Sequence, residues 1–544
     1  MFSKKVNYSF PIIIFIFCFA MLPVVQLDGL AMMPGDIGDA RLNNYFLENI
    51  YQFIIGNSDS LWHLSFFYPF PYVLGFSDNH FGTSPVYLLM RFLGSPTDTA
   101  FQIWFLMGYL ANFMAAYYAL RRLGGSKLAA CMGAVIFTFA LPTTAHVGHA
   151  QLHYRFGIPL AIVFLFDFLD KKTWRFLIIS GIWLVWQFYA GIYMGFFTLL
   201  LMLEMIACYV CYERFNKKNT LRSIFSNFVE SWRSLLFRNK IRYILLLVLL
   251  LFFLALLFYP YFQVSHLYGV KRSWDDISSM LPRPKSYFLS DISRLWSTPG
   301  SQFFSGIPMR HEHQMFIGLM PLFLALFGLW VGARKNIHSH FPMMVGMLGL
   351  MVILTLYVGG FSFWYFFHGL PLVSAIRAIS RLDQAILFPI ACLAVIGIDH
   401  MCKCYTSGLK IIASLILPLL LFEMFMVSMP VSPKEEWRMR IQQADKLVPH
   451  DLSEGSIVFM AQRDGPFFAD ELDAMWVSLN RGVKTLNGYS GLLPPSFSPT
   501  YGRDCKQLGD RIISYVDFSN YTNADGKYQQ LLSRVVPLGF ENCD

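Results

Sequence analysis

The protein has 544 residues, of which 55% are hydrophobic, 17% are aromatic and 14% are charged. This composition and a mean hydropathy of +0.47 exclude an ordinary soluble enzyme and indicate an integral membrane protein. The formal net charge of +9 gathers beside apolar segments, so it indicates membrane orientation and not nucleic-acid binding.

Apolar stretches long enough to cross a bilayer recur along the chain. A transmembrane helix needs about 20 mostly apolar residues, and by that measure the sequence contains roughly eleven candidates. We therefore expect an α-helical polytopic membrane protein. The candidates lie near residues 9 to 28, 99 to 120, 128 to 147, 156 to 170, 174 to 190, 192 to 212, 243 to 263, 315 to 332, 342 to 358, 383 to 400 and 409 to 429.

Lys and Arg gather in every second gap between these stretches. Because such loops stay on the cytoplasmic side, the N-terminus is expected to be cytoplasmic. The first stretch lacks a small-residue cleavage site and is interpreted as an uncleaved anchor. The same alternation predicts that the following segments lie outside: 28 to 98, 148 to 155, 264 to 314, 359 to 382 and the tail after Met429.

Two soluble parts stand out between and after the apolar stretches. Residues 213–242 mix basic and apolar side chains, which predicts an amphipathic helix on anionic lipid, with a solvated linker as the alternative. Residues 431–544 are expected to form a small exported α/β domain with strands at 456–460, 483–486 and 512–516. Its role is either support for the membrane part or acceptor binding. The residues that suggest these features are Trp476, Tyr489 and Tyr501, and the cysteines that allow one disulfide are Cys505 and Cys543.

The segment 34–41, directly after the first apolar stretch, carries two carboxylates and the guanidinium of Arg41. A carboxylate at the boundary of lipid and water can deprotonate an acceptor that attacks a sugar carbon. Asp39 stands just before a helix, where an N-cap role worth about 1 kcal/mol is the structural alternative. Asp36 has no such role and is flanked by glycines, so it is the preferred base.

From Ala40 onwards the pattern predicts a helix lying flat in the interface, with its polar face towards an aqueous pocket. Arg41 and Glu48 on that face are therefore candidate substrate-binding residues. Later in the same loop, Asp78 is a candidate for orienting sugar hydroxyls, with a Pro-rich loop packed on the bundle as the alternative. The apolar face consists of Leu42, Phe46, Ile50 and Phe53.

The second outer loop places several histidines close together, which first suggests zinc. No neighbouring carboxylate or cysteine in the sequence completes a ligand set, so no metal site is predicted. The alternatives are polar lining of a donor pocket, with His149 as the candidate residue, and simple loop solvation. The polar residues concerned are His146, His149, Gln151, His153 and Arg155.

The remaining candidates come from the third and fourth outer loops. Glu312 and His313 lie at the mouth of an apolar stretch, where ionisable groups are costly without partners or a role. Arg377 and Arg381 lie four residues apart, and arginine forks are suited to bidentate phosphate binding. Contact with lipid headgroups is the alternative for these two arginines.

The acidic motif 35–41 after an N-in anchor, an interfacial helix, many spans and a C-terminal outer domain together resemble the GT-C superfamily of polyprenyl-phosphate-dependent glycosyltransferases. The resemblance implies inverting transfer of a sugar from a lipid-linked donor on the outer face. Members usually carry an Asp-Glu or Asp-x-Asp pair in this loop. Here Asp36 and Asp39 stand in its place, so either of them is the expected base.

These expectations describe a transmembrane GT-C-like domain, 1–430, followed by an exported α/β domain, 431–544. The partners would be a polyprenyl-phosphate-linked sugar, membrane lipid and a glycan, lipid or protein acceptor, without nucleic acid. No cofactor is predicted, and assistance by a divalent cation is left open. The expected location is the bacterial inner membrane. The alternatives are a polytopic transporter or lipid-linked-sugar flippase and an inactive envelope scaffold.

Overall fold

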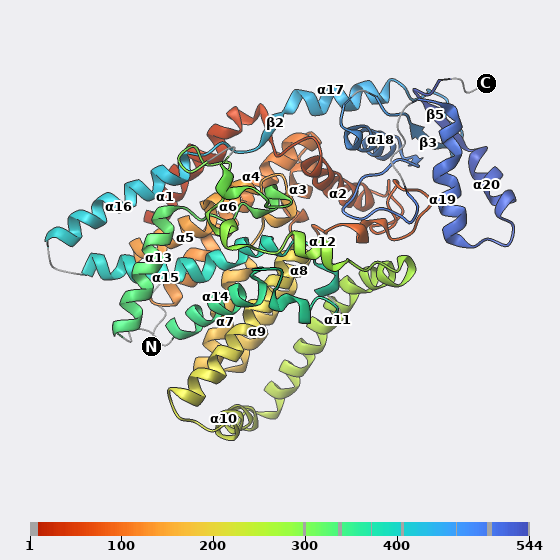
Figure 1. The fold of residues 1–544 in the computed structure, drawn as a ribbon. Helices are drawn as coiled ribbons and strands as arrows, with labels where there is room; N and C mark the ends of the chain where they lie inside the picture. Colours follow the sequence, from red (N-terminus) through yellow and green to blue (C-terminus); the bar gives the residue numbers. More distant parts are fainter. Residues whose placement is uncertain are drawn as a thin grey trace.

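The computed structural model describes residues 9–297, 301–335, 340–370, 373–403, 407–463, 465–497 and 503–541. Two of the expected features, Tyr501 and the cysteine at 543, fall outside these ranges, although Cys505 is disulfide-bonded. The molecule is mainly helical, with a bundle of long helices and a smaller α/β part at one end (Figure 1).

A helix occupies each of the apolar stretches expected from the sequence. Within the described residues, six segments are long and apolar enough to cross a membrane: Thr97–Arg122, Lys127–Ala145, Ala150–Lys171, Ile192–Phe215, Phe237–Tyr268 and Ile379–Lys403. The number that actually spans stays a prediction. The helices themselves are α1 (Ser9–Phe19), continued by η1 (Ala20–Val24), α4 (Thr97–Arg122), α5 (Lys127–Phe139), α6 (Leu141–Ala145), α7 (Gly157–Lys171), α8 (Trp174–Ala190), α9 (Ile192–Phe215), α11 (Phe237–Tyr268), α13 (Leu319–Lys335), α14 (Phe341–Thr355), α15 (Asp383–Lys403) and α16 (Ser407–Phe425).

Helix α15 lies at the centre of the bundle and packs against α5, α13, α14 and α16. Glycine permits its close approach to α13, since a Cβ added at Gly328 would lie 1.8 Å from the carbonyl oxygen of Leu393. Small residues commonly allow such contacts between membrane helices. In lipid the hydrophobic effect does not drive helices together, so their association depends on close van der Waals packing. The start of α15 therefore has a fixed position. Arg381 lies two residues before this start and is positioned by it.

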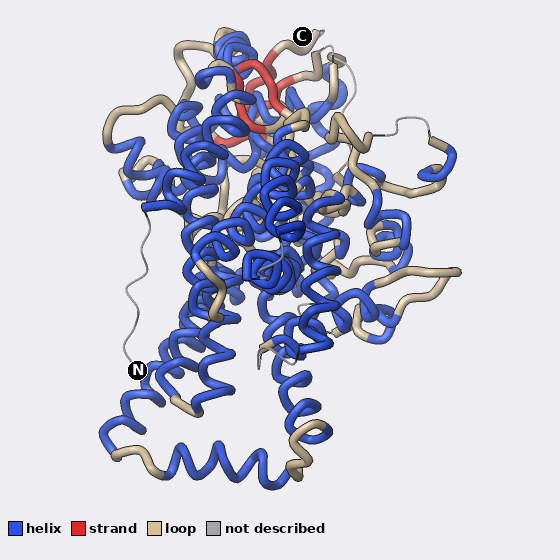
Figure 2. The backbone as a smooth tube through the Cα atoms, turned by 90° about the vertical axis from the view of Figure 1, so that its left-hand side faces the viewer, coloured by secondary structure: helices blue, strands red, loops and turns tan. Residues whose placement is uncertain are grey.

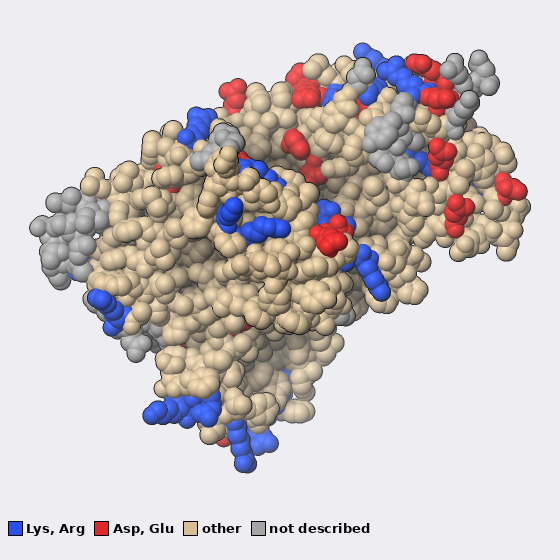
Figure 3. All heavy atoms as spheres, viewed as in Figure 1, with Lys and Arg blue, Asp and Glu red and all other residues tan. Residues whose placement is uncertain are grey.

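Helices α9 and α11 are joined at one end of the molecule by α10 (Leu221–Arg233), whose N-cap is Thr220. Figure 2 shows this crossing helix at the end far from the strands. Exposed basic side chains gather around it (Figure 3), as expected for a cytoplasmic end. They are Arg214, Lys217, Lys218, Arg222, Arg233, Arg238 and Arg242.

The opposite end of the bundle is built from loops with short helices. Strand β1 (Met32–Pro34) pairs antiparallel with β2 (Val431–Pro433), which joins the first outer loop to the chain beyond the last apolar helix. The longer helices here are α2 (Asp39–Ile54), α3 (Ser84–Phe92) and α12 (Trp274–Ser279). The 3₁₀ helices are η2 (Asp28–Leu30), η3 (Val73–Phe76), η4 (Ala150–Leu152), η5 (Pro284–Phe288), η6 (Gln302–Phe304), η7 (Arg310–His313), η8 (Phe363–Phe366), η9 (Val373–Ala375), η10 (Ile379–Leu382) and η11 (Cys505–Gly509).

The C-terminal α/β part has a parallel sheet in the order β4-β3-β5. The third expected strand, at 512–516, is wrong, because this segment lies in a helix and the third strand comes later. A short apolar run does not distinguish a strand from a helix that buries one face, and Ile512 and Val516 are buried one helical turn apart. The strands are β3 (Ile457–Met460), β4 (Lys484–Thr485) and β5 (Val535–Leu538), and the helices are α17 (Lys434–Asp445), α18 (Phe467–Arg481), α19 (Asp510–Ser519) and α20 (Ala524–Leu532).

The prediction that α2 lies flat in the interface with an aqueous polar face is also wrong. Its side chains are buried on both faces, because α18 packs against it from the C-terminal part. Tyr45 of α2 meets Trp476 of α18 edge to face, with ring centroids 5.8 Å apart. Arg41 is fully buried and forms a 2.8 Å ion pair with Asp473. A buried charge of this kind is tolerated only with a partner, so α2 and α18 are bound to each other by both apolar and ionic contacts.

Candidate active site

A cavity of about 200 Å³ lies where the outer loops, the outer ends of α9 and α11, and the C-terminal part meet. Its walls combine apolar side chains of the bundle with charged side chains of the loops. Four of the residues selected from the sequence line it, together with Tyr193 and Arg272, which were not selected. The four are Asp39, Asp78, Arg377 and Arg381.

A tight turn brings Asp39 to this cavity. Gly35 has a positive φ of 84°, and a Cβ there would lie 2.6 Å from the Cβ of Ala40, so only glycine fits. Gly38 is the N-cap residue of α2 and Asp39 is the first residue of the helix. The Asp39 carboxylate does not serve as the N-cap, and it points instead towards groups from distant loops.

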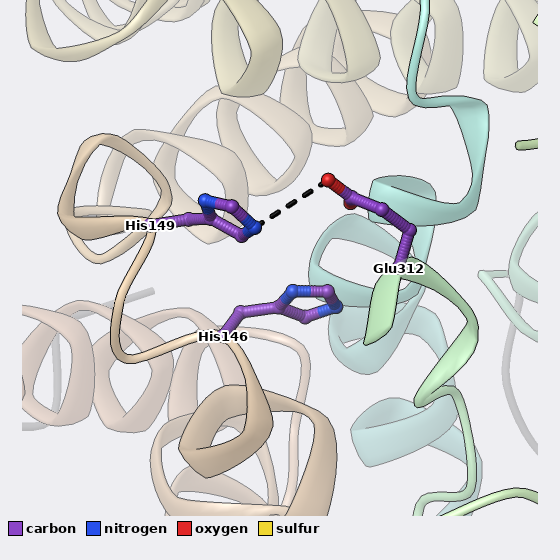
Figure 4. Close-up of side chains that lie close together, drawn as sticks. All are labelled: His146, His149 and Glu312. Atoms are coloured by element: carbon purple, nitrogen blue, oxygen red, sulfur yellow. Dashed lines mark ion pairs between the residues drawn. The ribbon is translucent and has the colours of Figure 1, made fainter. Parts of the chain in front are cut away.

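Those groups form a line of alternating charge. The Tyr489 hydroxyl donates to Asp39 Oδ1 at 2.7 Å, and His149 Nδ1 lies 3.0 Å from Asp39 Oδ2. On its other side, His149 Nε2 lies 3.4 Å from Glu312 Oε1, the ion pair drawn in Figure 4. Arg381 then donates to both oxygens of Glu312, at 2.9 and 2.6 Å. The order of charges is therefore carboxylate, imidazolium, carboxylate and guanidinium.

The pKa shifts follow from these contacts. Burial by itself raises the pKa of Asp39, but the contact with His149 and the hydrogen bond from Tyr489 outweigh it and lower the pKa to about 2. Burial and Arg381 lower the pKa of His149, yet Glu312 and Asp39 raise it to about 9. Although burial raises the pKa of Glu312, Arg381 and His149 hold it well below its ordinary value. At neutral pH the two carboxylates are ionised and His149 is protonated.

Two further guanidiniums border the cavity without a carboxylate partner. Among the described residues, no carboxylate lies within 4.0 Å of Arg272 or Arg377. Burial lowers the pKa of Arg272, and the positive charge of Arg377 lowers it further. Two like charges that face one cavity favour an anion between them. Arg272 was missed from the sequence, although a basic residue in an outer loop departs from the positive-inside bias and was a usable signal.

Asp78 borders the cavity, and its carboxylate caps the N-terminus of α9. Its carboxylate accepts the backbone N–H groups of Ile192, at 2.5 Å, and Tyr193, at 3.4 Å, at the start of α9. A carboxylate at a helix N-terminus satisfies unpaired donors and favours the helix dipole. Burial raises the pKa of Asp78 to about 6 in spite of these bonds. Asp78 therefore fixes the part of α9 that carries Tyr193 into the cavity.

The other residues selected from the sequence are held elsewhere. Asp36 is exposed and accepts the N–H of Gly38 at 3.1 Å. Glu48 is buried, where it accepts from Tyr87 at 2.7 Å and from Arg91, while Arg41 is paired with α18 as described above. His313 contacts the Ser286 hydroxyl at 2.8 Å, and burial lowers its pKa to about 4. The structure brings none of these four into the lining of the cavity.

One group of side chains has the composition of a metal site. One ligand atom each from His146, His149 and Glu312 lie within 4.8 Å of one another, and Figure 4 shows the three converging. The sequence offered no neighbouring carboxylate, but folding brings Glu312 from the third outer loop. Arg381 holds both oxygens of Glu312, however, so this carboxylate is neutralised without a cation. The proton on His149 supplies further positive charge between the carboxylates of Asp39 and Glu312.

The sequence matches no protein-family model and no curated protein. The fold of this chain is similar to those of several solved structures. A mutant of the mycobacterial arabinofuranosyltransferase AftD matches 92% of this chain and 34% of its own, with 12% identity and a TM-score of 0.50, and the unmutated enzyme matches 84% and 30%, with 12% identity and a TM-score of 0.48. ArnT from Cupriavidus metallidurans, solved with undecaprenyl phosphate, matches 88% of this chain and 90% of its own, with 10% identity and a TM-score of 0.45.

The chain spans about a third of the length of the arabinofuranosyltransferase chains that it matches. At this level of identity the likeness concerns the arrangement of the helices and not the identity of any side chain. It agrees with the resemblance drawn from the acidic motif of the first outer loop. The chain therefore has a fold like that of the arabinofuranosyltransferase AftD.

Proposed function

We propose that this protein is an inverting glycosyltransferase that moves a sugar from a polyprenyl-phosphate donor to an acceptor at the outer face of the membrane. The observation that carries the proposal is an ionised carboxylate, Asp39, in a cavity that also contains the guanidiniums of Arg272 and Arg377. The cavity lies at the start of α9 and near the end of α11, and both helices are long and apolar enough to cross a membrane. The GT-C fold is consistent with this chemistry.

The reaction is a single displacement. An acceptor hydroxyl oxygen attacks the anomeric carbon as the bond from that carbon to the donor phosphate oxygen breaks, and the electron pair of this bond leaves with the phosphate. Asp39 accepts the hydroxyl proton. A pKa of about 2 makes Asp39 a weak base, which suits a transition state of oxocarbenium character, where the attacking hydroxyl becomes acidic late. The negative charge of Asp39 also stabilises the positive sugar ring.

The departing phosphate needs positive charge. We assign this role to Arg377, as expected from the sequence, together with Arg272. Arg381 was the other candidate, but its guanidinium is bound in a fork to Glu312. Arg381 instead acts through Glu312, which in turn holds His149 against Asp39. Guanidiniums bind phosphate oxygens bidentately. These hydrogen bonds strengthen as negative charge develops on the leaving group.

The test uses the full chain in proteoliposomes with labelled undecaprenyl-phosphate arabinose, mannose, galactose and glucose, and with envelope extracts as acceptors. We expect one of these sugars to appear on an acceptor, and we expect Asp39→Asn to lower the transfer rate by about 10²- to 10⁴-fold at unchanged protein level. Transfer by neither the wild type nor any variant contradicts the proposal. Movement of the labelled lipid across the bilayer without transfer identifies the protein as a flippase, the alternative function.

A further inference from the structure

We propose that residues 487–492, in the C-terminal part of the chain, form the acceptor side of the active site and that Tyr489 positions Asp39 for catalysis. The inference rests on the proposed function and assigns an acceptor-facing wall within it. Of the two roles expected for the C-terminal part, support and acceptor binding, the inference assigns the second.

The direct contact is the hydrogen bond from the Tyr489 hydroxyl to Asp39 Oδ1, 2.7 Å long. The Tyr489 ring packs against Phe468 of α18, with centroids 5.7 Å apart, so the hydroxyl is held in one place. Burial and the negative charge of Asp39 raise the pKa of Tyr489, which keeps its hydroxyl protonated and donating. Because His149 contacts the other carboxylate oxygen, Asp39 is held on both sides and keeps lone pairs free for an acceptor proton.

Hydrogen bonds to strand β3 and to Glu471 fix the segment that carries Tyr489. The Asn487 side chain accepts from the N–H of Met460 at 2.7 Å and donates to the carbonyl of Met460 at 3.0 Å, which ties it to strand β3. The N–H of Gly488 donates to Glu471 at 2.7 Å, and Glu471 is paired in turn with the buried Arg511. A buried network of hydrogen bonds of this kind restricts a backbone segment to one position.

Glycine at 488 is required by packing. A Cβ at this position would lie 2.2 Å from the ring of Phe67, which is itself buried in the loop that precedes α3. Phe67 also donates its backbone N–H to the carbonyl of Asn487 at 2.9 Å. The first outer loop and the segment 487–492 therefore form one packed unit, and Tyr489 is placed relative to Asp39 through this contact.

Residues further along the segment complete the wall. Gly491 and Leu492 line the cavity, and the Gly491 carbonyl accepts from Arg272 Nη2 at 3.1 Å. The cavity is also lined by Tyr193 at the start of α9 and by Val264 of α11, on helices long and apolar enough to cross a membrane. We infer that a lipid carrier approaches the cavity along these helices and that the acceptor meets the residues contributed by the C-terminal part.

The first experiment compares Tyr489→Phe with Tyr521→Phe in the transfer assay. The phenylalanine keeps the ring packed on Phe468 and removes only the hydroxyl. We expect kcat to fall about 10- to 100-fold in Tyr489→Phe, the size of a hydrogen bond to a charged group, with the KM for the donor unchanged. Tyr521 is an exposed tyrosine of the same part of the chain, and its variant should keep wild-type kcat.

The second experiment probes the wall with Leu492→Trp, which narrows the cavity at a side chain that makes no hydrogen bond. We expect the KM for the acceptor to rise at least tenfold while binding of undecaprenyl phosphate stays at the wild-type level. Wild-type kcat in Tyr489→Phe, or a Leu492→Trp effect on phosphate binding alone, overturns the inference with the proposed function intact. A wild-type protein that transfers no sugar refutes the proposed function itself.

Discussion

Oδ2 of Asp39 lies 3.0 Å from Nδ1 of His149, and the opposite nitrogen of the same ring lies 3.4 Å from Glu312. The ring thus stands between two carboxylates that come from the first and third outer loops. Arg381 holds Glu312, and Tyr489 holds Asp39. The loops and the C-terminal part therefore all contribute to the position of the Asp39 carboxylate. A base that is held in this way is pre-organised, and substitutions in separate loops should affect the same catalytic step.

The first prediction separates the two carboxylates of the acidic motif. Asp39→Asn should reduce sugar transfer by about 10²- to 10⁴-fold, the usual contribution of a general base. Asp36→Asn is the matched control, because Asp36 is exposed and does not line the cavity, and it should keep wild-type activity. The measurement is initial transfer rate at equal protein level in proteoliposomes. A larger loss in the Asp36 variant would return the role of base to that residue.

The second prediction concerns the two arginines without carboxylate partners. Arg377→Lys keeps the charge but loses the planar fork, so the affinity for undecaprenyl phosphate should fall about tenfold or more. Arg272→Lys should act in the same direction, and binding by the wild type and by both variants should weaken at high salt because screening reduces the attraction between the charges. Arg481→Lys is the control, since Arg481 is paired with Asp445 on the surface. Equal binding by all of these variants would exclude Arg272 and Arg377 from the phosphate site.

The third prediction concerns pH. The pKa of His149 is raised to about 9 in the folded protein. A raised histidine pKa gives stability that is complete below the ordinary value of about 6.5 and is lost as pH rises through the folded value. Tm should therefore decline as pH rises from about 6.5 to about 9, whereas the transfer rate, which follows the protonation of His149 in the folded protein, should hold through neutral pH and fall as pH passes about 9. Asp39, with a pKa lowered to about 2, stays ionised throughout this range.

His149→Gln provides the control for the pH experiment. Glutamine bonds to neighbouring groups but does not titrate, so the alkaline fall should disappear from the Tm profile while the rate is low at every pH. A wild-type transfer rate that falls between pH 6 and 7 would mean that His149 has an ordinary pKa of about 6.5, and the alternating line of charges would then be incorrect.

Part of this arrangement could be predicted from the sequence and part could not. Hydropathy is a local property, so the apolar stretches were readable, while the sidedness of the loops stays a prediction. Asp39 and Arg377 were both selected from the sequence, and they line one cavity. The partners of each charge were not readable, because they depend on contacts between distant loops. The pairing of Arg41 with Asp473 is such a case, since an exposed helix and one covered by α18 have the same spacing of apolar residues.

The remaining prediction concerns divalent cations and follows from the group formed by His146, His149 and Glu312. Because Arg381 already neutralises Glu312, we expect transfer to continue in EDTA and Zn²⁺ to inhibit it. Binding of the metal must displace the His149 proton, so the apparent affinity for Zn²⁺ should rise about tenfold per pH unit up to a pH of about 9. His146→Gln, which removes one ligand and leaves the line of charges from Asp39 to Arg381 in place, should be resistant. Loss of transfer in EDTA with recovery in Mg²⁺ or Mn²⁺ would instead require that Glu312 leaves Arg381 to bind a catalytic ion.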